Sequence, residues 1–226
     1  MPDTSPSPDT SPQSDRLSQS DSAPEPAFPP IPEPIRDAVD LLSLLWSPLV
    51  VITANHEGER GAQIAVSAFA ASIVPQQPRI LVEAQKRNHT YSLIEASGRF
   101  GVSLLPEDRW EWVRDLGFRS QGAVEHQVDT DKFADDSRWT DGPHGIPLLA
   151  DAIGTLSCRV VNSMDGGDMT IFLAVVERAQ RLRQDPPVHW ADVRPRLPED
   201  WVEEYGRKLA FDIPDSARRM GELDPG

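Results

Sequence analysis

The sequence has one cysteine, Cys158, and no long apolar run. A single thiol cannot build an internal disulfide framework, and it suits a reducing compartment. The best apolar runs, such as residues 49–52, are far shorter than the ~20 residues that a membrane-spanning helix needs. The N-terminus also lacks a basic segment followed by an apolar stretch, which is the pattern of a signal peptide. We therefore expect a soluble, cytoplasmic protein.

Basic residues are scarce as well. The 22 lysines and arginines are outnumbered by 36 aspartates and glutamates, and the net charge is −14. A nucleic-acid-binding surface needs a basic face that displaces counterions from phosphates, and nothing in this sequence supplies one. Much of the acidity lies in residues 1–34 and 198–226, which we interpret as solvated tails that favour solubility.

The motifs of protein-only catalysis are missing too. The five histidines are scattered, without His-Glu-x-x-His or paired Cys/His spacing, so no metal site is expected. There is no Gly-x-Ser-x-Gly elbow, no phosphate-binding P-loop and no Gly-x-Gly-x-x-Gly fingerprint. Cys158 has apolar neighbours in a predicted strand, which is typical of a buried, inert thiol. A protein of this kind often obtains its chemistry from a cofactor.

Three regions follow from composition. Residues 1–34 are rich in proline and serine with one aromatic residue, so they cannot bury enough apolar surface to offset the entropy of ordering and are predicted to be disordered. Residues 35–197 carry the periodic patterns of a folded domain. Residues 198–226 form an acidic C-terminal tail, predicted to be partly helical, with a short helix that frays after Lys208.

Strands dominate the predicted domain. Helices are predicted at residues 35–46 and 90–97, the latter with Thr90 as N-cap, and another helix begins at Pro106. Residues 119–145 read as a long polar loop, and residues 165–168 as a tight turn. The predicted fold is mainly β with peripheral helices, closed into a barrel because closure removes exposed sheet edges. The predicted strands cover residues 49–53, 62–70, 79–84, 100–105, 152–162 and 169–179.

Two segments have the character of cofactor-binding surfaces. Residues 64–72 mix small side chains with hydroxyls, so a flat ring can approach the backbone there; tight packing of two strands explains this composition equally well. Residues 83–91 end a strand in the cations Lys86 and Arg87 just before a helix, which suits a phosphate. A solvated basic loop is the alternative for that segment.

The order of several short motifs resembles the flavin reductase-like, FMN-binding split-barrel family. Each motif is weak alone, but together they span roughly residues 38–190 in the order of that family. The motifs are Ser67-Ala68-Phe69 with Pro75 and Pro78, Asn88-His89-Thr90-Tyr91, Arg99-Phe100-Gly101-Val102, Asp131-Lys132-Phe133, Ile146-Pro147-Leu148-Leu149, Leu156-Ser157-Cys158-Arg159 and Gly167-Asp168-Met169-Thr170.

This resemblance implies a homodimeric FMN-binding split β-barrel with the flavin near the subunit interface. The small-residue strand would line the flavin ring, the basic loop would surround its phosphate, and the long polar loop would lie over it. The residues implied to bind FMN are Val66, Ser67 and Ala68 at the ring, Lys86, Arg87, Asn88 and Thr90 at the phosphate, and Ser120 and Lys132 from the long loop.

The late hairpin departs from the family pattern. The resemblance implies that Asp168 and Met169 meet the nicotinamide, and the family often has histidine at the second position. Methionine neither donates a hydrogen bond nor carries a charge. The usual Pro-Pro pair is also interrupted, between Pro75 and Pro78. With these changes we still expect flavin binding, but we do not expect rapid NAD(P)H oxidation.

Two functions are therefore compatible with the sequence. The first is an NAD(P)H-dependent flavin reductase that transfers a hydride to flavin, as the reductase partner of a flavin-using monooxygenase. The second is a non-catalytic flavin- or haem-binding carrier or sensor on the same barrel, which has lost its nicotinamide site. A pyridoxamine-phosphate oxidase-like activity shares the barrel but fits the motif order less well. Met169 is the feature that separates the first two.

Overall fold

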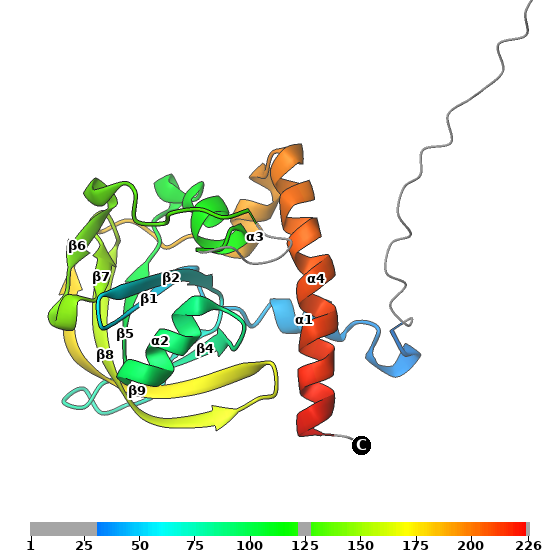
Figure 1. Cartoon of the computed structure of the whole chain (residues 1–226), viewed down its shortest axis with the longest axis horizontal. Helices are drawn as coiled ribbons and strands as arrows, with labels where there is room; N and C mark the ends of the chain where they lie inside the picture. The colour runs from blue at the N-terminus through cyan, green and yellow to red at the C-terminus, as the bar shows by residue number, and fades with distance from the viewer. Residues whose placement is uncertain (1–30, 122–127, 225–226) are drawn as a thin grey trace, which may run out of the picture.

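The structure is a computed structural model that describes residues 31–121 and 128–224. These residues form a curled β-sheet with helices at its periphery, and a long C-terminal helix runs along one side of the sheet (Figure 1). Disorder was predicted for residues 1–34; residues 1–30 lie outside the described residues, and a 3₁₀ turn begins at Glu33. Within the described part of the chain, no helix is both long enough and apolar enough to cross a membrane.

Seven antiparallel strands build the main sheet in the order β2-β1-β5-β8-β9-β4-β3. Strands β6 (Trp139–Asp141) and β7 (Pro147–Leu149) pair separately, and β6 lies within the segment that we predicted as a loop. The bounds of the main strands are β1 Val50–His56, β2 Glu59–Ala65, β3 Ala68–Ala70, β4 Arg79–Gln85, β5 Arg99–Leu104, β8 Gly154–Asp165 and β9 Met169–Arg181.

The two edge strands are consecutive pieces of one extended stretch. β2 pairs with β1, the chain bends at Val66 and Ser67, and β3 then pairs with β4 at the other edge. The sheet thus curls until its two edges meet through a single segment of chain. The predicted mainly β barrel with peripheral helices is confirmed, whereas the single strand predicted over residues 62–70 is in fact two strands divided by the bend.

Ser47 holds the bend in place. Its backbone N–H and its hydroxyl both donate to the carbonyl of Val66, at 2.7 and 2.8 Å, and its Oγ accepts from the N–H of Ala68 at 3.1 Å. On the other side of the bend, the N–H of Glu83 donates to the carbonyl of Ser67 at 3.1 Å. The carbonyls of Val66 and Ser67 and the N–H of Ala68 are therefore satisfied by hydrogen bonds at the bend.

Apolar residues of β1 are buried on both faces of the sheet, which explains why this strand reads as an unbroken apolar run. Val50 and Ile52 point into the barrel with Phe100, while Val51 packs into a second core beneath the segments that follow β5. Cys158 lies in the barrel core, where burial raises the pKa of its thiol to about 12, as expected for an inert cysteine.

Helix α2 (His89–Ser97) packs across β1 and β2. Its N-cap is Asn88 and not the predicted Thr90, and it ends at Gly98, whose φ of +66° suits a glycine. The approach to β2 is close: a Cβ on Gly61 would lie 2.9 Å from the Thr90 hydroxyl. A glycine at this position therefore lets the first turn of α2 rest against the end of β2.

The remaining helices are shorter than expected, except for the last. The predicted helix at residues 35–46 is a 3₁₀ turn and a short helix, and the predicted helix after Pro106 is a 3₁₀ turn and one turn of π-helix. The bounds are η1 Glu33–Ile35, α1 Ala38–Ser43, η2 Glu107–Arg109, η3 Arg114–Phe118, η4 Asp136–Arg138, η5 Pro143–Gly145, α3 Trp190–Val193, η6 Arg194–Arg196 and α4 Glu199–Leu223.

Helix α4 continues far past Lys208, where we predicted fraying. Near its start, buried Glu204 accepts from Arg114 at 2.9 Å and from Arg119 at 2.8 Å, which ties the helix to η3. Near its end, Met220 packs against the turn between β8 and β9 at Gly167, and Figure 1 shows that hairpin reaching toward α4. Tertiary contacts at both ends thus maintain a helix that carries Pro214 in its interior.

Candidate functional site

Two adjoining cavities lie where the bend of the barrel faces the start of α2 and the middle of α4. Their volumes are about 220 and 80 Å³. They share part of their lining, so they lie side by side, and together they are called the hollow, with a wide and a narrow end. The shared residues are Gln63, Ile64, Gln85, Asn88, Gly117 and Lys208.

The larger cavity has mostly apolar and aromatic walls. Val66 and Ser67 line it from the bend, and Trp46 and Trp190 from outside the barrel. Tyr205 of α4 completes this wall, with its ring 4.7 Å from the ring of Phe118. Burial, followed by the charge of Asp212, raises the pKa of Tyr205, so its hydroxyl stays protonated and able to donate a hydrogen bond. Flat walls of this kind suit a planar ring.

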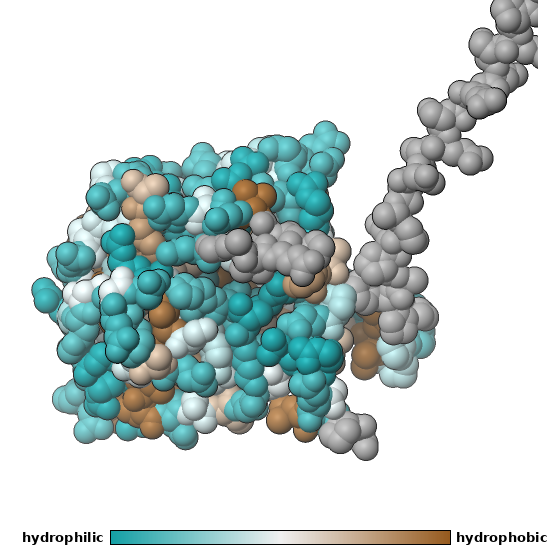
Figure 2. Space-filling view, in the orientation of Figure 1, coloured by the Kyte–Doolittle hydropathy of each residue, from teal (hydrophilic) through white to brown (hydrophobic). Residues whose placement is uncertain are grey.

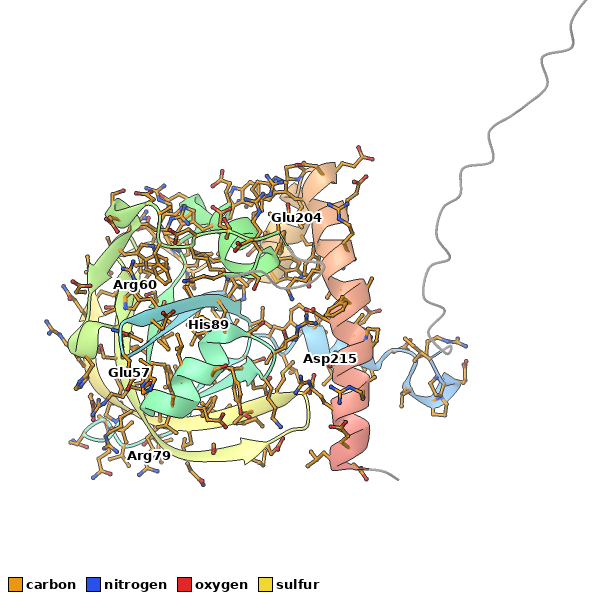
Figure 3. The ribbon with its side chains drawn as sticks, viewed as in Figure 1. Glu57, Arg60, Arg79, His89, Glu204 and Asp215 are labelled. Atoms are coloured by element: carbon orange, nitrogen blue, oxygen red, sulfur yellow. The ribbon has the colours of Figure 1, made fainter. Side chains whose placement is uncertain are left out.

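The smaller cavity is polar and cationic. It lies at the N-terminus of α2, where the Asn88 side chain makes no capping hydrogen bond, and Thr90 and Ser120 add hydroxyls. Lys132 and Lys208 bring two cations to it from different parts of the chain. Figure 3 marks the start of α2 at His89, together with two positions along α4. Free N–H groups, hydroxyls and lysines together favour an anion such as a phosphate.

Lys132 is the most perturbed group of the site. Its side chain is buried, and its Nζ donates to the carbonyls of Ala62 at 2.8 Å and Leu116 at 3.1 Å. Burial, followed by the charge of Lys208, lowers its pKa to about 7, against a smaller opposing effect of Asp115. The two lysines are therefore close enough to repel each other, and an anion between them would relieve that repulsion.

The sequence matches the flavin reductase like domain over residues 42–196, which is more than half of the chain. The chain belongs to the flavin reductase-like family. Helix α4 lies beyond the matched residues.

Curated relatives of this flavin reductase-like protein agree with that assignment. The ferric-chelate reductase (NAD(P)H) of Archaeoglobus fulgidus is 31% identical over 146 residues, which cover 64% of this chain and 81% of the relative. The reductase component of a 4-nitrophenol 4-monooxygenase/4-nitrocatechol 2-monooxygenase from Rhodococcus opacus is 33% identical over 135 residues, covering 59% of this chain and 65% of the relative.

Solved structures show the same fold. An NADH:FAD oxidoreductase of Streptomyces globisporus C-1027 superposes with a TM-score of 0.55 at 26% identity, over 72% of this chain and 92% of that one. A structure of the same oxidoreductase in complex with NAD and FAD fragments gives a TM-score of 0.54 at 27% identity, over 68% and 87% of the two chains.

The side chain of Gln63 tests whether a flavin suits the site. Its Oε1 is buried without a hydrogen-bond partner among the described residues, and Gln63 lines both cavities. A buried polar atom of this kind is costly unless a ligand or water completes its hydrogen bonding. A flavin has flat apolar faces, a polar ring edge and an anionic tail, so its parts correspond to the aromatic walls, to Gln63 and to the lysines. The residues present therefore fit the group.

The structure brings together most of the residues that the sequence indicated. Four of them line the larger cavity and four line the smaller one, with Asn88 common to both. The residues that line a cavity are Val66, Ser67, Asn88, Thr90, Ser120, Lys132 and Met169.

Four indicated residues line neither cavity. Lys86 turns away to pair with Asp165 at 2.5 Å, because the tight β8–β9 turn places that carboxylate beside the end of β4. Arg87 is buried against α4, and the side chains of Ala68 and Asp168 also lie outside the lining. Lys86 and Arg87 therefore have acidic partners and lie outside the lining of both cavities, and their placement around a phosphate stays a prediction.

Sequence reasoning missed several lining residues. Gln63 could have been recognised from the sequence, because a polar glutamine between Ala62 and Ile64 interrupts an apolar pattern in the strand. Tyr205 and Lys208 carried none: they come from the acidic C-terminal segment and reach the cavities only through the packing of α4.

Because of Lys132, we expect the free energy of unfolding to increase as the pH rises from 7 to 10. Between pH 7 and 10 the unfolded chain keeps a proton on this amine that the folded chain has released, so raising the pH favours the folded state by an amount on the order of a few kcal/mol. Urea denaturation at several pH values should show this rise in wild type and its loss in Lys132→Met. Lys86→Met, which retains Lys132, should keep the wild-type slope; equal slopes in all three proteins would contradict the prediction.

Proposed function

We propose that this protein is an NAD(P)H-dependent flavin reductase, with FMN as its flavin. Its family and the names of its relatives support the reductase activity, and the relatives include an NADH-dependent flavin reductase of Rhodococcus. The observation that carries the proposal is the hollow in which Gln63, whose Oε1 has no hydrogen-bond partner in the described part of the chain, lies between aromatic walls and two lysines. FMN is proposed because the narrow end gathers lysines and hydroxyls that suit a terminal phosphate.

Each part of the hollow has a role in this reaction. A flavin held here would supply the hydride-accepting chemistry, so the protein has to supply position rather than an acid or base. Val66 and Ser67 would lie against the ring, and the aromatic residues of the wider cavity would exclude water from it. Lys132, Thr90 and Ser120 would hold the phosphate end. Met169, at the start of β9, lines the wider cavity on the side proposed for the nicotinamide.

We also propose that a flavin-dependent monooxygenase receives the reduced flavin. The relative from Rhodococcus opacus is named as the reductase component of such a system, and a Rhodococcus jostii relative as a monooxygenase reductase subunit. A reductase of this kind has to release its flavin, which suits a site whose phosphate-binding cations come from separate loops and helices rather than from one rigid motif.

Reduction without oxygen tests the proposal. Purified protein is mixed with FMN and NADH under nitrogen, and absorbance near the flavin band is followed. We expect bleaching much faster than in the mixture without protein, with NADPH tried in parallel. A protein that binds FMN but leaves it oxidised would contradict the reductase and support the non-catalytic carrier. A Soret band on addition of haem, with no flavin binding, would support the haem-binding alternative.

Met169 is expected to limit this reduction. Replacing its thioether with the imidazole of Met169→His adds a hydrogen-bond donor on the proposed nicotinamide side, so hydride transfer should accelerate several-fold while FMN affinity stays nearly constant. Stopped-flow reduction of both proteins measures the rate. Met164→His, at an exposed position on the neighbouring strand, is the matched control and should behave as wild type. A well-folded Met169→His protein with an unchanged or slower rate would show that this position does not limit turnover.

We propose a homodimer because an apolar segment around α1 is left exposed by the other described residues. Figure 2 shows a largely hydrophilic face with scattered hydrophobic patches, one of them where the N-terminal described segment projects from the barrel. This segment is continuous with Trp46, which lines the larger cavity, so a second copy placed on it would also bound the flavin site. Its exposed residues are Ile35, Val39, Leu41, Leu42, Leu44 and Leu45.

Sedimentation equilibrium at micromolar concentration tests the dimer. Wild type should sediment with twice the chain mass, and Leu44→Glu should shift the equilibrium toward monomer, because the charge would lose its hydration at the interface. Leu223→Glu, at an exposed position near the end of α4, serves as the control and should remain dimeric. A wild-type protein of monomer mass would overturn the assignment.

A further inference from the structure

Asp212 of helix α4 binds two cations at the edge of the flavin site. Its carboxylate is buried; Oδ1 pairs with Arg87 and Oδ2 accepts from Lys208. The Arg87 guanidinium also lies over the ring of Phe211, 4.6 Å from its centroid. One carboxylate between two cations leaves a net positive charge at this place. Burial without both partners would be costly for any of these groups, so the cluster is held together by its own charges.

The two cations of this cluster differ in their access to the site. Lys208 lines both cavities, whereas Arg87 lines neither. Lysine carries its charge on a flexible four-carbon stem, so Lys208 is able to turn from Asp212 toward the hollow while the backbone of α4 stays in place. The planar guanidinium of Arg87 is held by its position over the ring of Phe211 and by its ion pair with Asp212.

The helix itself is fixed at both ends of this stretch. Glu204 binds Arg114 and Arg119 on η3, and these hydrogen bonds keep the pKa of Glu204 low although burial alone would raise it. At the far end, Gly167 packs against Met220. Figure 3 shows Glu204 and Asp215 along α4, on either side of the stretch that carries Lys208. A change of partner at Lys208 therefore requires movement of its side chain only, and not of the helix.

We infer that α4 supplies the cation that binds the flavin phosphate, Lys208, and that Asp212 holds this lysine until the phosphate replaces the carboxylate. The inference rests on the proposed flavin site and deepens it. A phosphate between Lys208 and Lys132 would take the place of an interaction that Lys208 already makes, and Arg87 would then balance the charge of Asp212. Arg87 is on this account a positioning residue, and no direct contact with the phosphate is needed to explain it.

Competition of this kind has a recognisable consequence. Asp212 and the phosphate bind the same lysine, so removing the lysine and removing the carboxylate should change FMN affinity in opposite directions. Riboflavin has the same ring but no phosphate, so neither change should alter its affinity. A purely structural role of α4 would instead weaken both flavins in both variants.

Equilibrium binding of FMN and riboflavin, followed by flavin fluorescence, is the test. Lys208→Ala should weaken FMN about ten- to a hundredfold, the effect of losing one charge-assisted hydrogen bond, and leave riboflavin within about twofold. Lys208→Arg should recover part of the FMN affinity. Arg207→Ala is the matched control: this neighbour is exposed, its nearest acidic atom is 3.8 Å away on Glu203, and both affinities should stay at wild-type values.

Asp212→Asn tests the opposite change. It should increase FMN affinity several-fold and leave riboflavin affinity unchanged. If that variant fails to fold, because Arg87 is left buried without its partner, the Lys208 variants and the salt dependence decide: FMN binding should weaken with added NaCl more steeply in wild type than in Lys208→Ala. Equal losses for both flavins in Lys208→Ala, or no loss for either, would overturn the inference while leaving the flavin site intact. A wild-type protein that binds neither flavin would overturn the proposed function itself.

Discussion

The bend between β2 and β3 is the constraint on which the rest of the molecule depends. Ser47 holds it by satisfying the backbone groups of Val66 and Ala68 that leave the sheet ladder there. Because the bend passes one segment of chain from β1 to β4, it closes the barrel. It also turns the backbone away from regular pairing, and the hollow opens at this place with Val66 and Ser67 in its wall. The same bend therefore closes the barrel and forms part of the wall of the candidate site.

Charged residues of both signs surround that hollow. The site gathers lysines in a protein of net charge −14, and it does so next to an acidic helix. Glu204 of α4 pairs with Arg114 and Arg119, and Asp212 of α4 pairs with Arg87. Ion pairs beside the hollow therefore attach the helix to the rest of the domain. An acidic C-terminal segment is thus a structural component of this protein, and not only a solubilising one.

Much of the fold was predictable because local patterns agree with the tertiary structure. The run from Leu49 to Thr53 predicts a buried strand, Gly166 and Gly167 predict the hairpin turn, and the strands occur where β-branched residues gather. The bend was not predictable, since Val66 and Ser67 have side chains typical of a strand and are diverted by Ser47, which lies 19 residues away in the chain. Helix α4 was underestimated for the same reason: its second half depends on partners such as Arg87 and Gly167.

The sequence by itself determined the family and the mainly β barrel, because residue order and strand periodicity are local properties of the chain. It also predicted that Ser67, Asn88, Thr90 and Lys132 belong to one site, and in the structure they line two adjoining cavities. Only the tertiary structure decided which cations face the hollow. A charged side chain is directed by the nearest opposite charge in space, so Arg87 turned to Asp212, and Lys208 reached the site from a helix more than a hundred residues away in the chain.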